Sequence, residues 1–280
     1  MAEHEHLIRQ LGLHLGHSSH YPQQLDPSLL SPVPRALART ELGLEPQALP
    51  FSGVDLWTGY ELSWLDARGK PQVAVADFSV PCTTPDLIES KSFKLFLNSF
   101  NQSRFADWQQ VEALLVAHLS RCAGGPVVVR LYRLAELNGQ PLAQLPGESL
   151  DEQALDFEHY SYNASLLRAD PQRIVNECLY SDLLKSNCLI THQPDWGSVL
   201  IRYRGPAIDR AALLRYLVSF RSHNEFHEQC VERIFCDLLH HCRPEQLTVY
   251  ARYTRRGGLD INPFRSNFEQ PPANSRLSRQ

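Results

Sequence analysis

An internal repeat constrains the fold of this 280-residue chain more than any other feature of its sequence. Residues 97–100 (LNSF) match residues 217–220 (LVSF) at an offset of 120, and Phe105 matches Phe226 at an offset of 121. Each match is weak by itself, but a near-constant offset over several segments is not expected by chance. The sequence therefore predicts two similar modules that join near residues 140–165.

The residue pattern of the first module predicts a β-hairpin, two helices and a further strand. Residues 57–65 and 73–80 have the composition of strands and flank a turn-rich connection. Helices are expected around residues 87–100 and over residues 105–119, and residues 126–132 favour a strand. Because the second module repeats this order, we expect an α+β fold in which each module has antiparallel strands and two helices on one face.

We expect an N-terminal arm over residues 1–50, a first module over residues 51–150 and a second module over residues 151–280. The arm holds five of the twelve histidines, namely His4, His6, His14, His17 and His20. Their spacing matches no standard metal site. We therefore expect a peripheral arm and no bound metal.

Composition excludes several classes of function. With 27 Lys and Arg against 31 Asp and Glu, the net charge is −4, which argues against direct nucleic-acid binding through phosphate contacts. No apolar run approaches the length of a spanning helix, and the N-terminus lacks the pattern of a secretory signal. The seven cysteines include no C-x-x-C pair, so neither a disulfide framework nor a zinc site is expected. We expect a cytoplasmic protein with no membrane association.

The second module holds the residues best suited to catalysis. Cys188 precedes Asp195 by seven residues in a polar, proline-containing loop, which suits a nucleophilic thiol with a nearby proton donor. A buried cysteine and a turn aspartate are the alternative. His227 and Glu228 open an amphipathic helix, where we expect the histidine and backbone N–H groups to face outward towards a polar ligand. An ordinary acidic first turn is the alternative there.

Other polar residues are divided between the modules. Residues 89–91 (ESK) have no counterpart in the second module. Two arginines and two glycines at residues 255–258 would let a guanidinium and the backbone approach a phosphate, although a basic turn without a function is the alternative. No Rossmann or P-loop motif is present, so a nucleotide cofactor would bind outside those folds. Each module therefore carries part of a polar site, and we expect this site to be built within one chain.

Four segments together resemble the NADPH-dependent 7-cyano-7-deazaguanine reductases in their long, two-module form. They are ESKSFKLFLNSFN, CLITHQPDW, SFRSHNEFHE and RYTRRGGLDINP, and they occur in the order typical of that family. The resemblance runs from about residue 50 to residue 280. It implies tandem tunnelling-fold modules, the fold group that also includes GTP cyclohydrolase I and pterin enzymes.

The resemblance also implies roles for individual residues. The catalytic residues would be the nucleophile Cys188, the general acid/base Asp195, and His227. The residues expected to bind 7-cyano-7-deazaguanine are Ile88, Glu89, Ser90, His227 and Glu228, and those expected to hold NADPH are Ser90, Lys91, Arg256 and Gly257. The implied reaction reduces the nitrile to 7-aminomethyl-7-deazaguanine through a covalent thioimide, with two NADPH per turnover, in tRNA queuosine biosynthesis.

Two other functions and two further expectations stay open. A cysteine-dependent hydrolase or amidase would use Cys188 and His227 without a nicotinamide, and a non-catalytic purine- or pterin-binding protein would form no covalent adduct. We expect a homodimer, because tunnelling folds close barrels between modules. Cys230 lies three residues after His227 on the expected helix, so a protective disulfide between Cys188 and Cys230 is a further hypothesis. A core cysteine is the alternative.

Overall fold

The computed structural model describes residues 21–280, so the five histidines of the expected arm lie outside the described residues. The chain forms two compact units. Unit 1 comprises the residues up to 38 together with 56–140 and 255–260, and unit 2 comprises residues 39–55, 141–254 and 261–280. Each unit combines helices with mainly antiparallel strands, which confirms the predicted α+β fold and is consistent with tandem tunnelling-fold modules.

The main elements of unit 1 are the hairpin strands β2 (Ser52–Leu65) and β3 (Pro71–Pro81), then β4 (Asp86–Ile88), α3 (Ser90–Asn98), α4 (Trp108–Ala123) and β5 (Val128–Tyr132). The first four residues of β2 are part of unit 2. Strand β3 lies between β2 and β5 and is antiparallel to β5. The shorter elements in this part of the chain are η1 (Pro27–Leu29), β1 (Pro32–Pro34), α2 (Arg35–Glu41) and α5 (Leu134–Leu137).

Aromatic packing holds α3 against the strands of unit 1. The Phe93 ring lies 5.4 Å from Trp57 of β2 and 4.9 Å from Phe78 of β3, measured between ring centroids. All three side chains are buried. Burial of such large rings is the main favourable contribution to folding, and it fixes where α3 begins relative to the strands.

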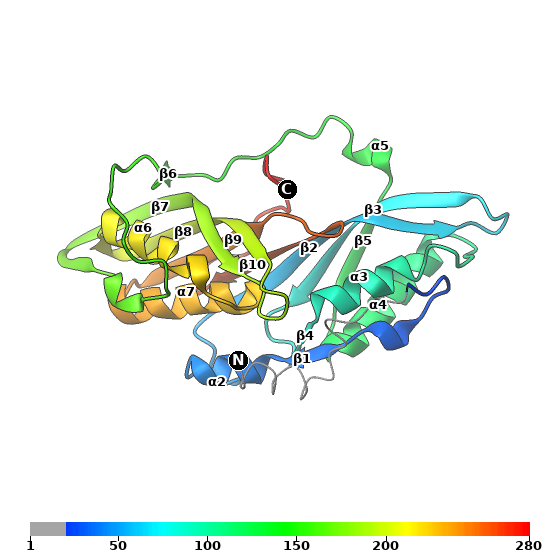
Figure 1. The fold of residues 1–280 in the computed structure, drawn as a ribbon, viewed down its shortest axis with the longest axis horizontal. Helices are drawn as coiled ribbons and strands as arrows, with labels where there is room; N and C mark the ends of the chain where they lie inside the picture. The colour runs from blue at the N-terminus through cyan, green and yellow to red at the C-terminus, as the bar shows by residue number, and fades with distance from the viewer. Residues whose placement is uncertain (1–20) are drawn as a thin grey trace. The chain divides into compact units, whose positions relative to one another are not determined.

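The main elements of unit 2 are β7 (Ala169–Asn187), β8 (Pro194–Ile208), α6 (Arg210–Ser219), α7 (His227–Cys242), β9 (Gln246–Tyr253) and β10 (Leu259–Ser266). The first two residues of β10 are part of unit 1. The shorter elements are β6 (Glu148–Ser149), η2 (Ala164–Leu166) and η3 (Phe220–Ser222). The strand order is β10-β9-β8-β7-β6, antiparallel except for the β6–β7 pair. Figure 1 shows α6 and α7 along one face of these strands, where α6 contacts β7 and α7 contacts β8 and β9. Segments 143–146 and 269–277 lie over the other face.

The predicted order of hairpin, helix, helix and strand is confirmed in both halves of the chain. Strand β10 was not predicted. All eight of its residues are buried, so it lacks the alternation of a half-exposed strand, and it contains Pro263, which argues against a strand interior. The polar loop expected around Cys188 is shorter than predicted, because Asp195 and Trp196 belong to β8.

Two predictions from composition can be compared with the structure. All seven cysteines are free thiols in the structure. Between residues 21 and 280, no helix combines the length and the apolar character needed to cross a membrane.

Candidate active site

Cys188 lies at the end of a β-hairpin in unit 2, directly after β7. The hairpin register pairs Asn187 with Pro194 and Ser186 with Asp195, so the cysteine and the aspartate lie at the same end of the two strands. The loop is closed by two backbone hydrogen bonds, from Cys188 N to Gln193 O at 2.8 Å and from His192 N to Cys188 O at 3.0 Å. The Cys188 side chain is half-buried and Asp195 is buried. A thiol at this position has a fixed backbone and partial access to solvent.

The segment before α7 is joined to the same hairpin end. Asn187 N donates to His223 O at 2.8 Å, and Glu225 N donates to Asn187 O at 3.0 Å. The buried Glu225 carboxylate pairs with the Arg233 guanidinium at 2.6 Å and with His223 Nε2 at 3.1 Å. These contacts fix the start of α7 against the residue that precedes Cys188.

His227 is the first residue of α7 and points towards Asp195. Its Nε2 lies 3.6 Å from Asp195 Oδ1, which is an ion-pair distance when the histidine is protonated and is too long for a hydrogen bond. The histidine side chain is only 11% exposed. The prediction that it faces outward was wrong, because the ring packs inward against an aromatic neighbour.

That neighbour is Tyr253 of β9. The rings of His227 and Tyr253 meet edge to face, with centroids 4.2 Å apart and an interplanar angle of 89°. Gly197 of β8 makes room for the tyrosine, since a Cβ atom there would lie 3.0 Å from the tyrosine ring. Tyr253 is fully buried, and burial raises the pKa of its hydroxyl well above the ordinary value. A rigid aromatic surface therefore sets the orientation of the imidazole.

Cys230 lies one turn after His227, inside the protein. It is fully buried, and burial together with the negative charge of Glu225 raises the pKa of its thiol above the ordinary value. A protonated thiol is a poor nucleophile. Of the two cysteines, the half-buried Cys188 is therefore the one suited to attack a substrate.

Lys185 brings a positive charge to the same end of the hairpin. Its ammonium group donates to Asn187 Oδ1 at 2.5 Å and to Arg221 O at 2.6 Å. Burial lowers the pKa of Lys185, as does the nearby Arg221 charge, whereas the negative charge of Asp195 acts in the opposite direction. The Asp195 carboxylate is thus within electrostatic reach of a fixed cation.

The first-module residues expected at the site surround the start of α3 in unit 1. Ile88 ends β4 and is buried. Glu89 is the N-cap of α3, and its two carboxylate oxygens accept from Lys91 N at 2.9 Å and from Ser92 N at 2.7 Å. Ser90 and Lys91 form the first turn of the helix. Sequence reasoning did not foresee that Glu89 caps this helix.

Arg256 and Gly257 lie in a tight turn that is also part of unit 1. The Arg256 N–H donates to Leu259 O at 3.0 Å, and Gly257 and Gly258 both have positive φ angles, which favour glycine. A Cβ at Gly257 would lie 3.3 Å from Cδ of Lys94 on α3. The structure therefore brings the arginine turn next to the helix that begins with Ser90 and Lys91.

Two family comparisons match this chain. Residues 21–131 match the family described as nitrile reductase, 7-cyano-7-deazaguanine-reductase N-term, and residues 194–272 match the family described as QueF-like protein. The two matches cover the two modules in order, as in the long form of these enzymes.

The chain belongs to the 7-cyano-7-deazaguanine reductase family. It is therefore a nitrile reductase of the queuosine pathway, and its two-module form is the one that the sequence motifs predicted. Within residues 21–280, no cluster of three or more His, Cys, Asp or Glu side chains could hold a metal ion.

Sequence reasoning about this reductase missed three residues that shape the site. Tyr253 and Glu225 lie inside the segments RYTRRGGLDINP and SFRSHNEFHE without a role of their own, and Lys94 lies inside the expected helix around residues 87–100. The position of Lys94 beside Lys91 could have been predicted from the sequence, because the two lysines are three residues apart and so share a helix face. The roles of Tyr253 and Glu225 depend on which strand and which loop pack against α7. The residues near them in the sequence do not determine that packing.

Proposed function

We propose that this chain reduces the nitrile of 7-cyano-7-deazaguanine to the aminomethyl group with NADPH as the reductant. The observation that carries this proposal is the hairpin end in unit 2, where Cys188 and Asp195 lie at the same end of the two strands and His227 lies 3.6 Å from the carboxylate. In a member of the nitrile reductase family, that arrangement supplies a nucleophile and a proton donor for one carbon–nitrogen triple bond.

Cys188 would act as the nucleophile. A nitrile carbon is a modest electrophile, and thiolate addition forms a carbon–sulfur bond while Asp195 gives a proton to the nitrogen, which yields a covalent thioimide. After one reduction, the carbon–sulfur bond breaks, the thiolate leaves and an imine remains. A second reduction gives the amine. The four electrons correspond to two NADPH and two further protons per product.

Asp195 and His227 would act together in proton transfer to the nitrogen of the nitrile. The carboxylate is buried, and the imidazole is held at 3.6 Å by the Tyr253 ring. A protonated imidazole at this distance would stabilise the carboxylate that remains after Asp195 gives its proton to the substrate.

Recognition of the deazaguanine would rest on two carboxylates. A carboxylate can accept both N–H groups of a guanine-like N1 and 2-amino edge, and Glu228 in the first turn of α7 suits that role together with His227. Glu89 already accepts two backbone N–H groups, and each of its oxygens retains one further lone pair. Ile88 and Ser90 flank it in the chain.

The residues proposed for NADPH fit a phosphate-bearing dinucleotide. Lys91 begins α3, and the Arg256–Gly257 turn lies against Lys94 one turn further along that helix. Three basic side chains beside a glycine backbone would pair with the phosphates, including the one that distinguishes NADPH from NADH. Ser90 would add a hydroxyl donor. When bound, NADPH supplies the hydride for each reduction.

We also propose the setting in which this activity occurs. Seven free thiols are typical of a reducing compartment, which favours the cytoplasm. The proposed partner is the small deazaguanine substrate, without direct nucleic-acid binding, and the proposed assembly is a homodimer. The proposed functional division remains an arm over residues 1–50 and modules over residues 51–150 and 151–280.

The decisive experiment mixes the protein with 7-cyano-7-deazaguanine, first without and then with NADPH. Without NADPH, mass spectrometry is expected to show the mass of the substrate added at Cys188. With NADPH, the loss of its absorbance is expected to be two equivalents per amine formed. One NADPH oxidised per nitrile consumed, with no amine formed, would mean that the reaction stops at the imine and would contradict the proposal.

The same experiment separates the two other functions. A cysteine hydrolase would convert the nitrile without consuming NADPH, and the product would be an amide or an acid. A non-catalytic binding protein would retain the deazaguanine but show no added mass on any cysteine.

A further inference from the structure

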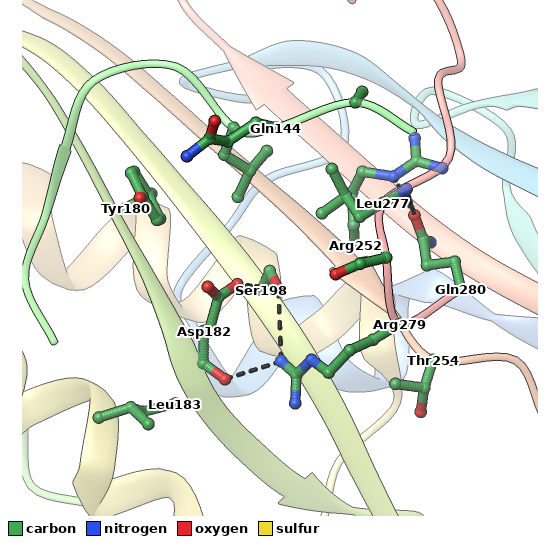
Figure 2. A pocket seen from close by; sticks show the side chains of 13 residues that line it. Gln144, Tyr180, Asp182, Leu183, Ser198, Arg252, Thr254, Leu277, Arg279 and Gln280 are labelled. Carbon is green, nitrogen blue, oxygen red and sulfur yellow. Dashed lines mark hydrogen bonds between the residues drawn. The ribbon is translucent and has the colours of Figure 1, made fainter. Parts of the chain in front are cut away.

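Unit 2 contains a cavity of about 560 Å³ on the face of β8 and β9 that lies opposite α7. Volumes in this range are typical of small-molecule sites in proteins. Figure 2 shows side chains of the strands, including Ser198 and Arg252, and of the segment 277–280 converging on this space. None of its lining residues belongs to the candidate active site.

Arg252 is the unusual residue of this cavity. It is 3% exposed, and its guanidinium donates from Nε to Gln280 Oε1 at 2.6 Å and from Nη1 to Asn274 Oδ1 at 2.9 Å and to the Tyr250 hydroxyl. All three acceptors are neutral. Among residues 21–280, no carboxylate pairs with this guanidinium, and its Nη2 has no hydrogen-bond partner.

The other two buried arginines of unit 2 each pair with a carboxylate inside the protein. Arg265 pairs with Asp55 at 2.8 Å and with Glu232 at 2.9 Å, and Arg39 pairs with Glu232 at 2.7 Å. A buried charge without a counter-charge is costly, so buried arginines normally have such partners. Arg252 departs from this rule and lines a cavity.

A second guanidinium lies at the edge of the same cavity. Arg279 donates from Nη2 to Asp182 O at 2.7 Å, to Gly197 O at 3.1 Å and to Ser198 Oγ at 3.3 Å, as Figure 2 shows for Asp182 and Ser198. Its Nε and Nη1 have no partner in the described part of the chain. With two arginines and one aspartate, Asp182, the side chains of the lining carry a net charge of +1, whereas the side chains of the whole chain sum to −4.

We propose that this cavity binds a small phosphate-bearing anion, with Arg252 and Arg279 as its charged ligands. A guanidinium presents its N–H groups in a fork that matches two phosphate oxygens, and a tetrahedral phosphate has enough oxygens to meet two such forks. Thr254 and Tyr180, which also line the cavity, add hydroxyl donors. The bound anion supplies the counter-charge that no carboxylate within residues 21–280 gives to Arg252.

The proposed anion site is separate from the catalytic residues. Arg252 and Tyr253 are neighbours on β9, so their side chains lie on opposite faces of the sheet. Tyr253 contacts His227, whereas Arg252 lines the cavity. Anion binding here is therefore expected to be independent of Cys188 and of the nitrile substrate.

The test measures binding of inorganic phosphate, and separately of ribose 5-phosphate, to the full chain by calorimetry and by thermal unfolding. Sodium chloride at matched ionic strength corrects for general screening. The wild type is expected to bind at least one of the two probes with a single site, and its unfolding temperature is expected to rise with that probe. Arg279→Glu, at an exposed position, is expected to weaken binding by at least about tenfold, because it replaces a cation with an anion.

Matched variants decide the interpretation. Arg276→Gln removes an exposed arginine three residues away that does not line the cavity, and it is expected to bind like the wild type. Cys188→Ala is also expected to bind normally, so failure of the proposed reductase mechanism would not affect this result. Arg252→Gln provides a second test, read by calorimetry on folded protein. Absence of binding in the wild type, or unchanged affinity in both Arg279→Glu and Arg252→Gln, would overturn the proposal.

Discussion

Helices α4 and α7 occupy equivalent places in the two modules, but they begin differently. Both have 16 residues and both end at a residue with left-handed backbone angles, Gly124 and Arg243. Helix α4 is capped by Asp107, whose carboxylate accepts from Gln110 N at 2.8 Å. The N-cap of α7 is Phe226, which makes no side-chain hydrogen bond to the helix.

This difference shows how one module can specialise after duplication. An aspartate cap satisfies backbone N–H groups and stabilises the helix, so the start of α4 is a structural feature. The start of α7 lacks such a cap and carries His227 and Glu228, beside the buried Asp195. We infer that the start of α7 lacks the stabilising cap and instead carries groups that can contact a substrate, whereas the start of α4 retains the cap.

The largest expected effect is at Cys188, since only the second module is proposed to carry the nucleophile. Cys188→Ala is expected to abolish the covalent adduct and to lower nitrile reduction by at least about a thousandfold, because no other group in the proposed mechanism forms the bond. Cys236→Ala, at another half-buried cysteine of unit 2, is the control and is expected to retain activity. An adduct that persists in Cys188→Ala protein would remove this cysteine from its role.

Asp195 is expected to show the next largest effect. Asp195→Asn removes the proposed proton donor, and such a loss lowers turnover by about a hundredfold or more. The comparison is Asp237→Asn, because Asp237 is a half-buried carboxylate on α7 that accepts from the Tyr162 and Tyr216 hydroxyls at 2.9 Å and 2.5 Å. Steady-state rates of the two purified variants give the result. Similar turnover in both would argue against a special role for Asp195.

The two helix starts can be tested directly against each other. Asp107→Ala is expected to lower the free energy of unfolding by about 1 kcal/mol through loss of the cap, with KM unchanged. Glu228→Gln is expected to raise KM for the nitrile by at least about tenfold, because an amide has only one acceptor oxygen for two N–H groups. Denaturant unfolding and steady-state kinetics on both variants provide the four measurements.

The opposite result would contradict the roles assigned here to the two helix starts. If Asp107→Ala changed KM and Glu228→Gln changed only stability, α4 rather than α7 would border the substrate. Asp107→Asn serves as the control for the cap, since asparagine caps helices about as well as aspartate.

The sequence predicted the fold class and the order of the helices and strands better than the details of the site. Repeated apolar spacing identified the helices that became α3, α4 and α7, because amphipathic periodicity is a local property. The fully buried β10 escaped detection, because burial on both faces leaves no alternation. The inward orientation of His227 was also missed, since it depends on Tyr253, 26 residues away in the sequence and adjacent only in the folded sheet.

The smallest expected effect concerns that tyrosine, and it tests whether the packing beneath α7 matters for chemistry. Tyr253→Phe keeps the ring that meets His227 edge to face and is expected to change turnover by no more than about threefold. Tyr253→Leu removes the aromatic edge and leaves space beside the His227 ring, so it is expected to lower turnover by about tenfold more than the phenylalanine variant.

Because burial raises the pKa of the Tyr253 hydroxyl well above its ordinary value, that group stays protonated across neutral pH. The pH profile of Tyr253→Phe is therefore expected to match the wild type up to about pH 9. If the leucine variant lost stability but kept the turnover and pH profile of the phenylalanine variant, the ring would support the core of unit 2 without orienting His227.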